Sequence, residues 1–171
     1  MAYKTYSAEY GANAIQNIQP NAPVIFGDVA VPYESNSRGF VYHRTESGIF
    51  LLASVIPNPI YSNQSFGCGC CNVPIPETLY LVTFSGNIAV PTGETVGEIS
   101  LGIAIDGEID DSSIMRTTPT VVETYDSVST QVLVSVPAIC GCQSISVRNL
   151  SGIPINSQNA NLVIAYNGVR Y

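Results

Sequence analysis

The amino-acid sequence predicts an all-β protein, an antiparallel β-sandwich or barrel of many short strands. First, short runs in which apolar and polar residues alternate recur along the chain, and Gly, Pro, Asn or Asp bound each run. Second, these turn residues recur at roughly 8–12-residue spacing, which is typical of sandwiches and barrels. Third, no segment carries a clear helical stripe, since the best helical candidate, Ser7–Ile18, is weakened by Gly11.

The first twenty residues differ in character from the rest of the chain. Residues 1–20 are polar, contain Tyr3, Tyr6 and Tyr10, show no clear period and end at Pro20. We therefore expect an extended N-terminal arm over 1–20 and a single all-β domain over 21–171, since 171 residues are the size of one domain. An arm that adds a strand to the sheet of a neighbouring subunit would make Tyr3, Tyr6 and Tyr10 assembly residues.

The predicted strands follow the arm in sequence order. Thr78–Val90 is the clearest: Leu79 and Leu81 alternate with Tyr80 and Val82, and Pro91-Thr-Gly93 ends the run. A tight turn at Asp106-Gly107 closes Val96–Ile105. The full set is Val24–Val31, Phe40–His43, Ile49–Ile56, Thr78–Val90, Val96–Ile105, Ser113–Thr118, Thr120–Tyr125, Thr130–Val136, Ser144–Leu150 and Asn161–Tyr166.

All five cysteines of the chain lie in two short clusters, Cys68-Gly-Cys70-Cys71 and Cys140-Gly-Cys142. The first lies in a loop of about twenty residues, and loops this long in compact domains usually carry a function. If Ser113–Tyr125 is one broken strand, the clusters follow the third and seventh strands. Both clusters are then expected at one end of the sandwich, together with the acidic turn 106–111.

The spacing of the cysteines leaves their chemistry open. Adjacent Cα atoms lie about 3.8 Å apart, below the 4.4–6.8 Å span of a disulfide, so Cys70 and Cys71 are not expected to pair with each other. Because five is odd, at least one sulfur remains for a partner chain, a metal or a free thiol. Three alternatives follow: reduced or intrachain cysteines that pin two loops, crosslinks between chains, and a tetrahedral zinc site with unusually short spacers.

The composition excludes several classes of function. With 6 basic and 13 acidic residues the net charge is −7, which argues against nucleic acid and anionic membranes as partners. No apolar stretch reaches the roughly 20 residues of a membrane span, and the N-terminus has no apolar signal region. Charged residues make up 11% of the chain, against about 25% in typical domains, which indicates a surface that partners cover.

No set of catalytic residues is visible. The only histidine, His43, has no nucleophile or carboxylate partner that the sequence can assign. The chain contains neither a Gly-x-Ser-x-Gly elbow nor a phosphate-binding glycine motif. The acidic turn from Asp106 to Asp111 lacks the spacing of an EF-hand, so a solvated hairpin and a calcium site are both alternatives. We therefore expect neither an enzyme nor a bound cofactor.

Several stretches resemble a bacterial family of small jelly-roll proteins from spore-forming bacteria, similar to the trimeric heads of the tumour-necrosis-factor and complement type. The similar stretches are 39–49, 79–93, 97–108, 147–156 and 158–164, within about Phe26 to Tyr166. The resemblance implies a ten-strand jelly roll, a homotrimer and a location on a spore or cell surface. It supplies no catalytic residue or ligand. The chain departs from filament-capping relatives in having no Gly-X-Y stalk.

The sequence therefore predicts a structural, self-assembling protein that is made without a signal peptide. A trimeric subunit of a surface filament or layer would be crosslinked through Cys68, Cys70, Cys71, Cys140 and Cys142, as in cysteine-rich jelly rolls that build disulfide-locked spore appendages. The alternative is a trimeric receptor-binding or adhesive head that recognises a glycan or a protein.

Overall fold

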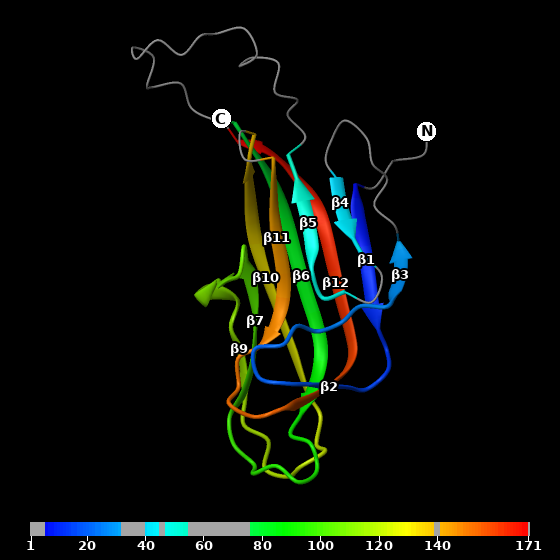
Figure 1. Cartoon of the computed structure of the whole chain (residues 1–171), viewed down its shortest axis with the longest axis vertical. Helices are drawn as coiled ribbons and strands as arrows, with labels where there is room; N and C mark the ends of the chain where they lie inside the picture. The colour runs from blue at the N-terminus through cyan, green and yellow to red at the C-terminus, as the bar shows by residue number, and fades with distance from the viewer. Residues whose placement is uncertain (1–5, 32–39, 45–46, 55–75, 139–140, 171) are drawn as a thin grey trace, which may run out of the picture.

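Two antiparallel β-sheets pack face to face in this computed structural model, which confirms the predicted jelly-roll sandwich (Figure 1). The structure describes residues 6–31, 40–44, 47–54, 76–138 and 141–170. Within these ranges no helix is long and apolar enough to cross a membrane. The one helical element described is a single 3₁₀ turn, η1 (Asp111–Ser113).

The first sheet has the order β10-β6-β12-β1-β3, and β2 pairs with β12 beside β1. Its strands are β1 (Ser7–Ala12), β2 (Gln16–Ile18), β3 (Asp28–Val31), β6 (Glu77–Ala89), β10 (Asp126–Pro137) and β12 (Ile155–Arg170). The second sheet has the order β4-β5-β11-β7-β8, and β9 pairs with β7. Its strands are β4 (Phe40–His43), β5 (Phe50–Ala53), β7 (Ile99–Ile105), β8 (Glu108–Ile109), β9 (Met115–Thr117) and β11 (Cys142–Asn149).

The core lies between the two sheets and is formed by alternate residues of each strand. In β6 the inward side chains Tyr80, Val82 and Phe84 are fully buried, as the alternation in the sequence predicts. Across the sandwich, Phe50 of β5 packs edge-on against Phe26, with ring centroids 5.5 Å apart. These side chains belong to one continuous cluster that joins both sheets.

The N-terminal segment forms part of the sandwich, which corrects the expected arm over 1–20. Strand β1 pairs with β12 over its whole length, from Ser7 opposite Ala165 to Ala12 opposite Ala160, and also pairs with β3. Its inward side chains Ala8, Tyr10 and Ala12 are buried. The alternation was missed because two of these three side chains are small and because Gly11 interrupts the pattern. Described residues 6–20 therefore do not project as an arm.

The same segment then crosses to the second sheet. The amide of Asn21 donates to the carbonyl of Asn149 at 2.9 Å, and the amide of Val24 donates to the carbonyl of Val147 at 2.8 Å. Residues 7–24 thus hydrogen-bond first to β12 in one sheet and then to β11 in the other. In Figure 1 this blue segment runs across the lower half of the molecule.

The predicted strand at Thr120–Tyr125 is wrong, because these residues form turns before β10. Glu123 has a left-handed backbone with φ of 57°, and its amide donates to the carbonyl of Val90 at 2.8 Å. This conformation interrupts the extended backbone that a regular strand requires. The last predicted strand, Asn161–Tyr166, is in contrast too short, since β12 extends over Ile155–Arg170 with two bulges.

Candidate assembly face and cysteine-bearing end

The structure describes one of the five predicted crosslinking residues. Cys142 is the first residue of β11, and its thiol is exposed and free. Cys68, Cys70, Cys71 and Cys140 lie outside the described residues. Among the described residues there is therefore a single accessible thiol, at the end of a strand that pairs with β5.

The described residues that flank the two cysteine-bearing segments lie together, at the end of the sandwich where the sequence predicts both clusters. The amide of Ser54 donates to the carbonyl of Gly141 at 3.1 Å, and the amide of Ala138 donates to the carbonyl of Pro76 at 3.1 Å. Residues 54 and 76, which flank 55–75, and residues 138 and 141, which flank 139–140, therefore lie at one end of the sandwich. The turn at Asp106 joins this end, because its amide donates to the carbonyl of Ser144 at 2.8 Å.

Two carboxylates of the acidic turn, those of Asp106 and Asp110, accept local hydrogen bonds. Asp106 Oδ1 accepts from the amide of Ser144 at 2.7 Å, and Asp110 Oδ1 accepts from the amide of Ser112 at 2.9 Å and so caps η1. No group of three metal-ligating side chains occurs within the described parts of the chain. These contacts favour the hydrogen-bonded hairpin over the calcium site.

The predicted assembly tyrosines have different positions. Tyr10 is 4% exposed, and its ring packs edge-on against Phe50 at 4.7 Å and His43 at 4.9 Å. Burial raises the pKa of the Tyr10 hydroxyl. Tyr6 is partly buried against Tyr166 at 6.3 Å, and Tyr3 lies outside the described residues. Tyr10 is therefore a core residue and not a contact for another subunit.

His43 has structural contacts. Its ring stacks on Phe50, with centroids 4.2 Å apart and planes inclined by 13°. Its Nε2 lies 2.8 Å from the carbonyl oxygen of Ser47, to which a protonated Nε2 donates. The ring thus packs between the sheets beside Tyr10, an environment that fits a role in packing.

The feature that sequence reasoning missed is the outer face of the first sheet. Leu133 of β10 lies directly opposite Leu81 of β6, which lies opposite Ala165 of β12. Directly opposed residues point to the same side of a sheet, so these three form one apolar row on the face that points away from the core. Leu79 and Val163 flank the row on the same face. We call these five residues the assembly face.

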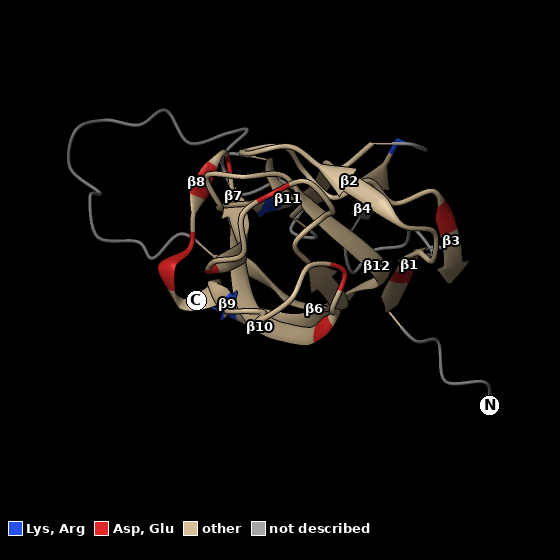
Figure 2. Ribbon diagram, turned by 90° about the horizontal axis from the view of Figure 1, so that it is seen from below, with Lys and Arg blue, Asp and Glu red and all other residues tan. Residues whose placement is uncertain are grey.

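Charges are confined to the ends of the three strands that carry the assembly face. The charged residues of β6, β10 and β12 are Glu77, Asp126 and Arg170, each at a strand terminus. Seen from below, acidic ribbon segments lie around the rim of the molecule, and several of them gather near β8 (Figure 2). Glu77 is paired with Arg170 and accepts a hydrogen bond from Ser135 Oγ at 2.6 Å. The Ser135 hydrogen bond and then Arg170 lower the pKa of the Glu77 carboxyl.

A signal for this face is present in the sequence of β6. An antiparallel strand with one solvated face alternates apolar with polar residues, whereas a strand that is covered on both faces is apolar throughout. The segment Leu79-Tyr-Leu-Val82 is apolar at every position. This pattern favours a covered outer face, although it does not identify which residues of β10 and β12 share it.

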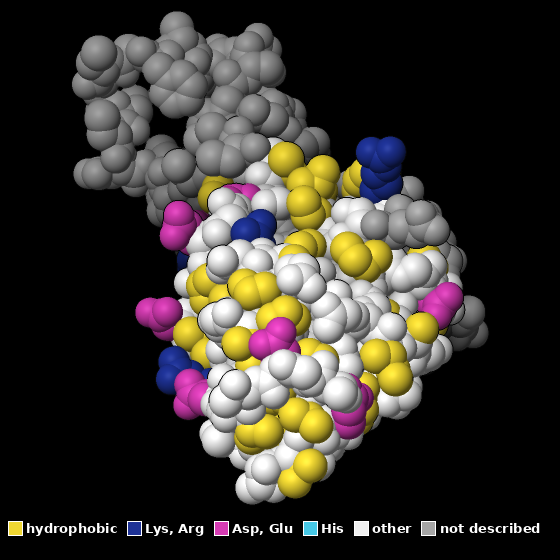
Figure 3. Space-filling model, turned by 60° about the horizontal axis from the view of Figure 1, so that its bottom comes forward, with side chains coloured by type: hydrophobic (Ala, Val, Ile, Leu, Met, Phe, Trp, Pro, Cys, Tyr) yellow, Lys and Arg dark blue, Asp and Glu magenta, His cyan; other side chains and the backbone are white. Residues whose placement is uncertain are grey.

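On the side of the molecule in Figure 3, hydrophobic side chains lie in several small groups, and charged side chains of both signs lie among and around them. Comparison of the chain with protein-family models gave no match, and comparison with curated proteins gave no significant match. The functional argument therefore rests on the fold and on these residues.

Proposed function

We propose that this protein is a structural subunit that assembles with copies of itself through the assembly face. The homotrimeric state and the location on a spore or cell surface are taken from the family resemblance. The thiols at the cysteine-bearing end then link trimers into a filament or layer. The same resemblance supports a non-catalytic role without a cofactor.

The observation that carries the proposal is the apolar row on the outer face of the first sheet, carried by strands whose charges lie only at their ends. Glu9 of the neighbouring β1 borders this face opposite Val163 and accepts a hydrogen bond from Asn161. Leu133 is 50% exposed on the edge strand β10, at the end of an apolar row whose centre is Leu81, and the nearest charges along β6, β10 and β12 lie at the strand ends. A solvated sheet face normally presents polar and charged side chains, whereas interface centres are depleted of charge. A second copy of the chain suits this face as a partner. Its own assembly face is also apolar, so no charge would be buried without a countercharge.

Exposed Cys142 supports the linkage between subunits. Its thiol is accessible, and the chain segments that contain the other four cysteines leave from the same end of the sandwich. An odd number of cysteines leaves at least one for a partner chain when the others pair within the chain.

The variant Leu133→Arg tests the assembly face. Fully burying a leucine contributes about 1.5–3 kcal/mol, so the exposed half is worth about 0.8–1.5 kcal/mol per subunit. Three subunits lose about 2.4–4.5 kcal/mol, which weakens trimer formation by roughly 50- to 1,600-fold before any cost of burying the charge. Analytical ultracentrifugation over a dilution series measures this shift. Val121→Arg, at an exposed apolar residue (58%) outside the face, is the matched control.

Two results would refute the proposal. A wild-type protein that remains monomeric at all accessible concentrations excludes self-assembly, and a Leu133→Arg variant that assembles like the wild type excludes this face. Electron microscopy with and without reductant tests the crosslinks. We expect higher assemblies to fall apart to trimers on reduction, and the variant Cys142→Ser to form fewer of them.

A further inference from the structure

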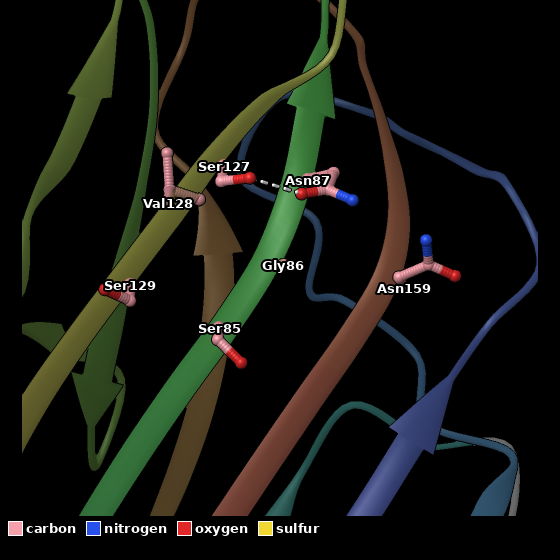
Figure 4. Close-up of a pocket in the computed structure, with 7 residues that line it drawn as sticks. All are labelled: Ser85, Gly86, Asn87, Ser127, Val128, Ser129 and Asn159. Atoms are coloured by element: carbon pink, nitrogen blue, oxygen red, sulfur yellow. Dashed lines mark hydrogen bonds between the residues drawn. The ribbon is translucent and has the colours of Figure 1, made fainter.

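A polar hollow lies on the outer face of the first sheet, beyond the assembly face along the same strands. Its volume is about 240 Å³, and residues of β6, β10 and β12 line it (Figure 4). From Leu81 to Ser85 along β6 is four residues, or about 13 Å. The outward side chains around the hollow are Ser85 and Asn87 of β6, Ser127 and Ser129 of β10, and Asn159 of β12.

A β-bulge in β12 forms one side of the hollow. Asn87 lies opposite Gln158 and Ser85 lies opposite Asn161, so two residues of β12, Asn159 and Ala160, face the single residue between them on β6. A bulge bends its strand and redirects a side chain. Here Ala160 is buried, whereas Asn159 is exposed at the hollow and has a left-handed backbone with φ of 53°. Asparagine tolerates this conformation better than most residues.

The backbone beneath the hollow admits no larger residue without rearrangement. A Cβ atom on Gly86 would lie 3.3 Å from the Cα of Ala160 and 3.2 Å from the ring of Phe84. Gly86 therefore lets β6 and β12 approach closely at the bulge, and the hollow belongs to the fixed framework of the sheet.

The chemistry of the lining selects for one class of ligand. Every polar side chain around the hollow is a neutral hydroxyl or carboxamide, and these groups both donate and accept hydrogen bonds. Ser127 Oγ donates to Asn87 Oδ1 at 2.9 Å, which orients the Asn87 amide so that its Nδ2 group is the remaining donor. An ionic ligand would lose hydration here without a countercharge from the lining, and an apolar ligand would leave the hydroxyls unpaired.

We propose that this hollow binds a neutral sugar, as a single hexose unit of a larger glycan. Each hydroxyl of a sugar ring donates and accepts, which matches the lining, and the volume falls just below the roughly 300–1,000 Å³ of typical small-molecule sites. This activity is additional to self-assembly and does not depend on it, because no lining residue of the hollow belongs to the assembly face.

Saturation-transfer NMR with the full chain tests the proposal, with glucose, galactose, mannose and N-acetylglucosamine as probes. We expect at least one of them to bind the wild-type protein. Asn159→Gly removes the side chain and suits the left-handed backbone, and Asn87→Ala removes the second carboxamide. Each variant should weaken binding by about 2- to 10-fold, the effect of one neutral hydrogen bond.

Gln131→Ala is the matched control, since Gln131 lies on the same face outside the hollow and donates to Thr83 at 3.0 Å. This variant should bind the sugar like the wild type. The proposal is overturned if none of the four sugars binds, or if the double variant Asn87→Ala/Asn159→Gly binds as well as the wild type. It is also overturned if the double variant loses self-association instead, because the hollow is then a contact between copies.

Discussion

The buried position of Tyr10 predicts that the first strand is essential for stability. Tyr10 is 4% exposed, and replacing a buried aromatic residue with alanine costs about 3–5 kcal/mol. Its edge-on contacts with Phe50 and His43 contribute to that cost, since such aromatic pairs add about 0.5–1.5 kcal/mol beyond the area that they bury. Native domains are stable by only about 5–15 kcal/mol. The variant Tyr10→Ala should therefore lose a large share of its stability.

Thermal and urea unfolding followed by circular dichroism measure this loss. A loss of 1 kcal/mol lowers the Tm of a domain of this size by about 2–4 °C, so the variant Tyr10→Ala should have a Tm lower by roughly 6–20 °C. Tyr42→Ala is the comparison, because Tyr42 is 50% exposed on β4 and should lose less burial. Both variants and the wild type are measured at one protein concentration, since assembly alters Tm. A Tyr10→Ala variant that unfolds within about 1 kcal/mol of the wild type would show that β1 is a dispensable arm.

Three further predictions concern other parts of the sandwich. The lowered pKa of Glu77 means that its contribution to stability is present above pH 4.5 and is lost as the pH falls through its lower folded pKa. Glu77→Gln should therefore lower Tm at pH 7 and make little difference in strong acid. Gly48→Ala would place a Cβ 2.6 Å from the carbonyl oxygen of Val24 and should cost about 1–3 kcal/mol in urea unfolding, whereas Gly27→Ala meets open space and should be tolerated. Asn149→Ala removes the donor to the carbonyl of Ile18 in β2 and to the carbonyl of Ile153 in the loop before β12, and should cost at least about 1–3 kcal/mol, so near-wild-type stability would contradict its bridging role.

The fold class could be predicted because alternation is a local property. Strand β4 has the predicted bounds Phe40–His43, and β6 differs from its prediction by one residue at each end. Strand β1 escaped detection because Ala8 and Ala12 carry little apolar signal, although they fill the space beside Tyr10. Small residues in a core are specified by their neighbours across the sheet and not by their own hydrophobicity.

The assembly face could not be predicted because it depends on long-range register. Leu81 lies opposite Leu133, which is 52 positions later in the chain (133 − 81), and opposite Ala165, which is 84 positions later (165 − 81). No hairpin turn fixes those pairings, so the sequence around each residue carries no information on its partners. The shared end of the residues that flank the two cysteine-bearing segments was predictable, in contrast, because it needs only the alternating direction of consecutive strands.

The pairing of β1 with β12 has a consequence for biosynthesis. Strand β12 lies between β6 and β1 in the first sheet, yet it follows every other strand in the sequence. While the ribosome is still making the C-terminal residues, β1, β2 and β6 each lack the neighbour that satisfies one row of their backbone hydrogen bonds. Such open edges attract other chains, and contacts between distant residues form slowly. The nascent chain thus passes through a stage in which its apolar strands are unprotected, and the sandwich closes only after the whole sheet has been synthesised.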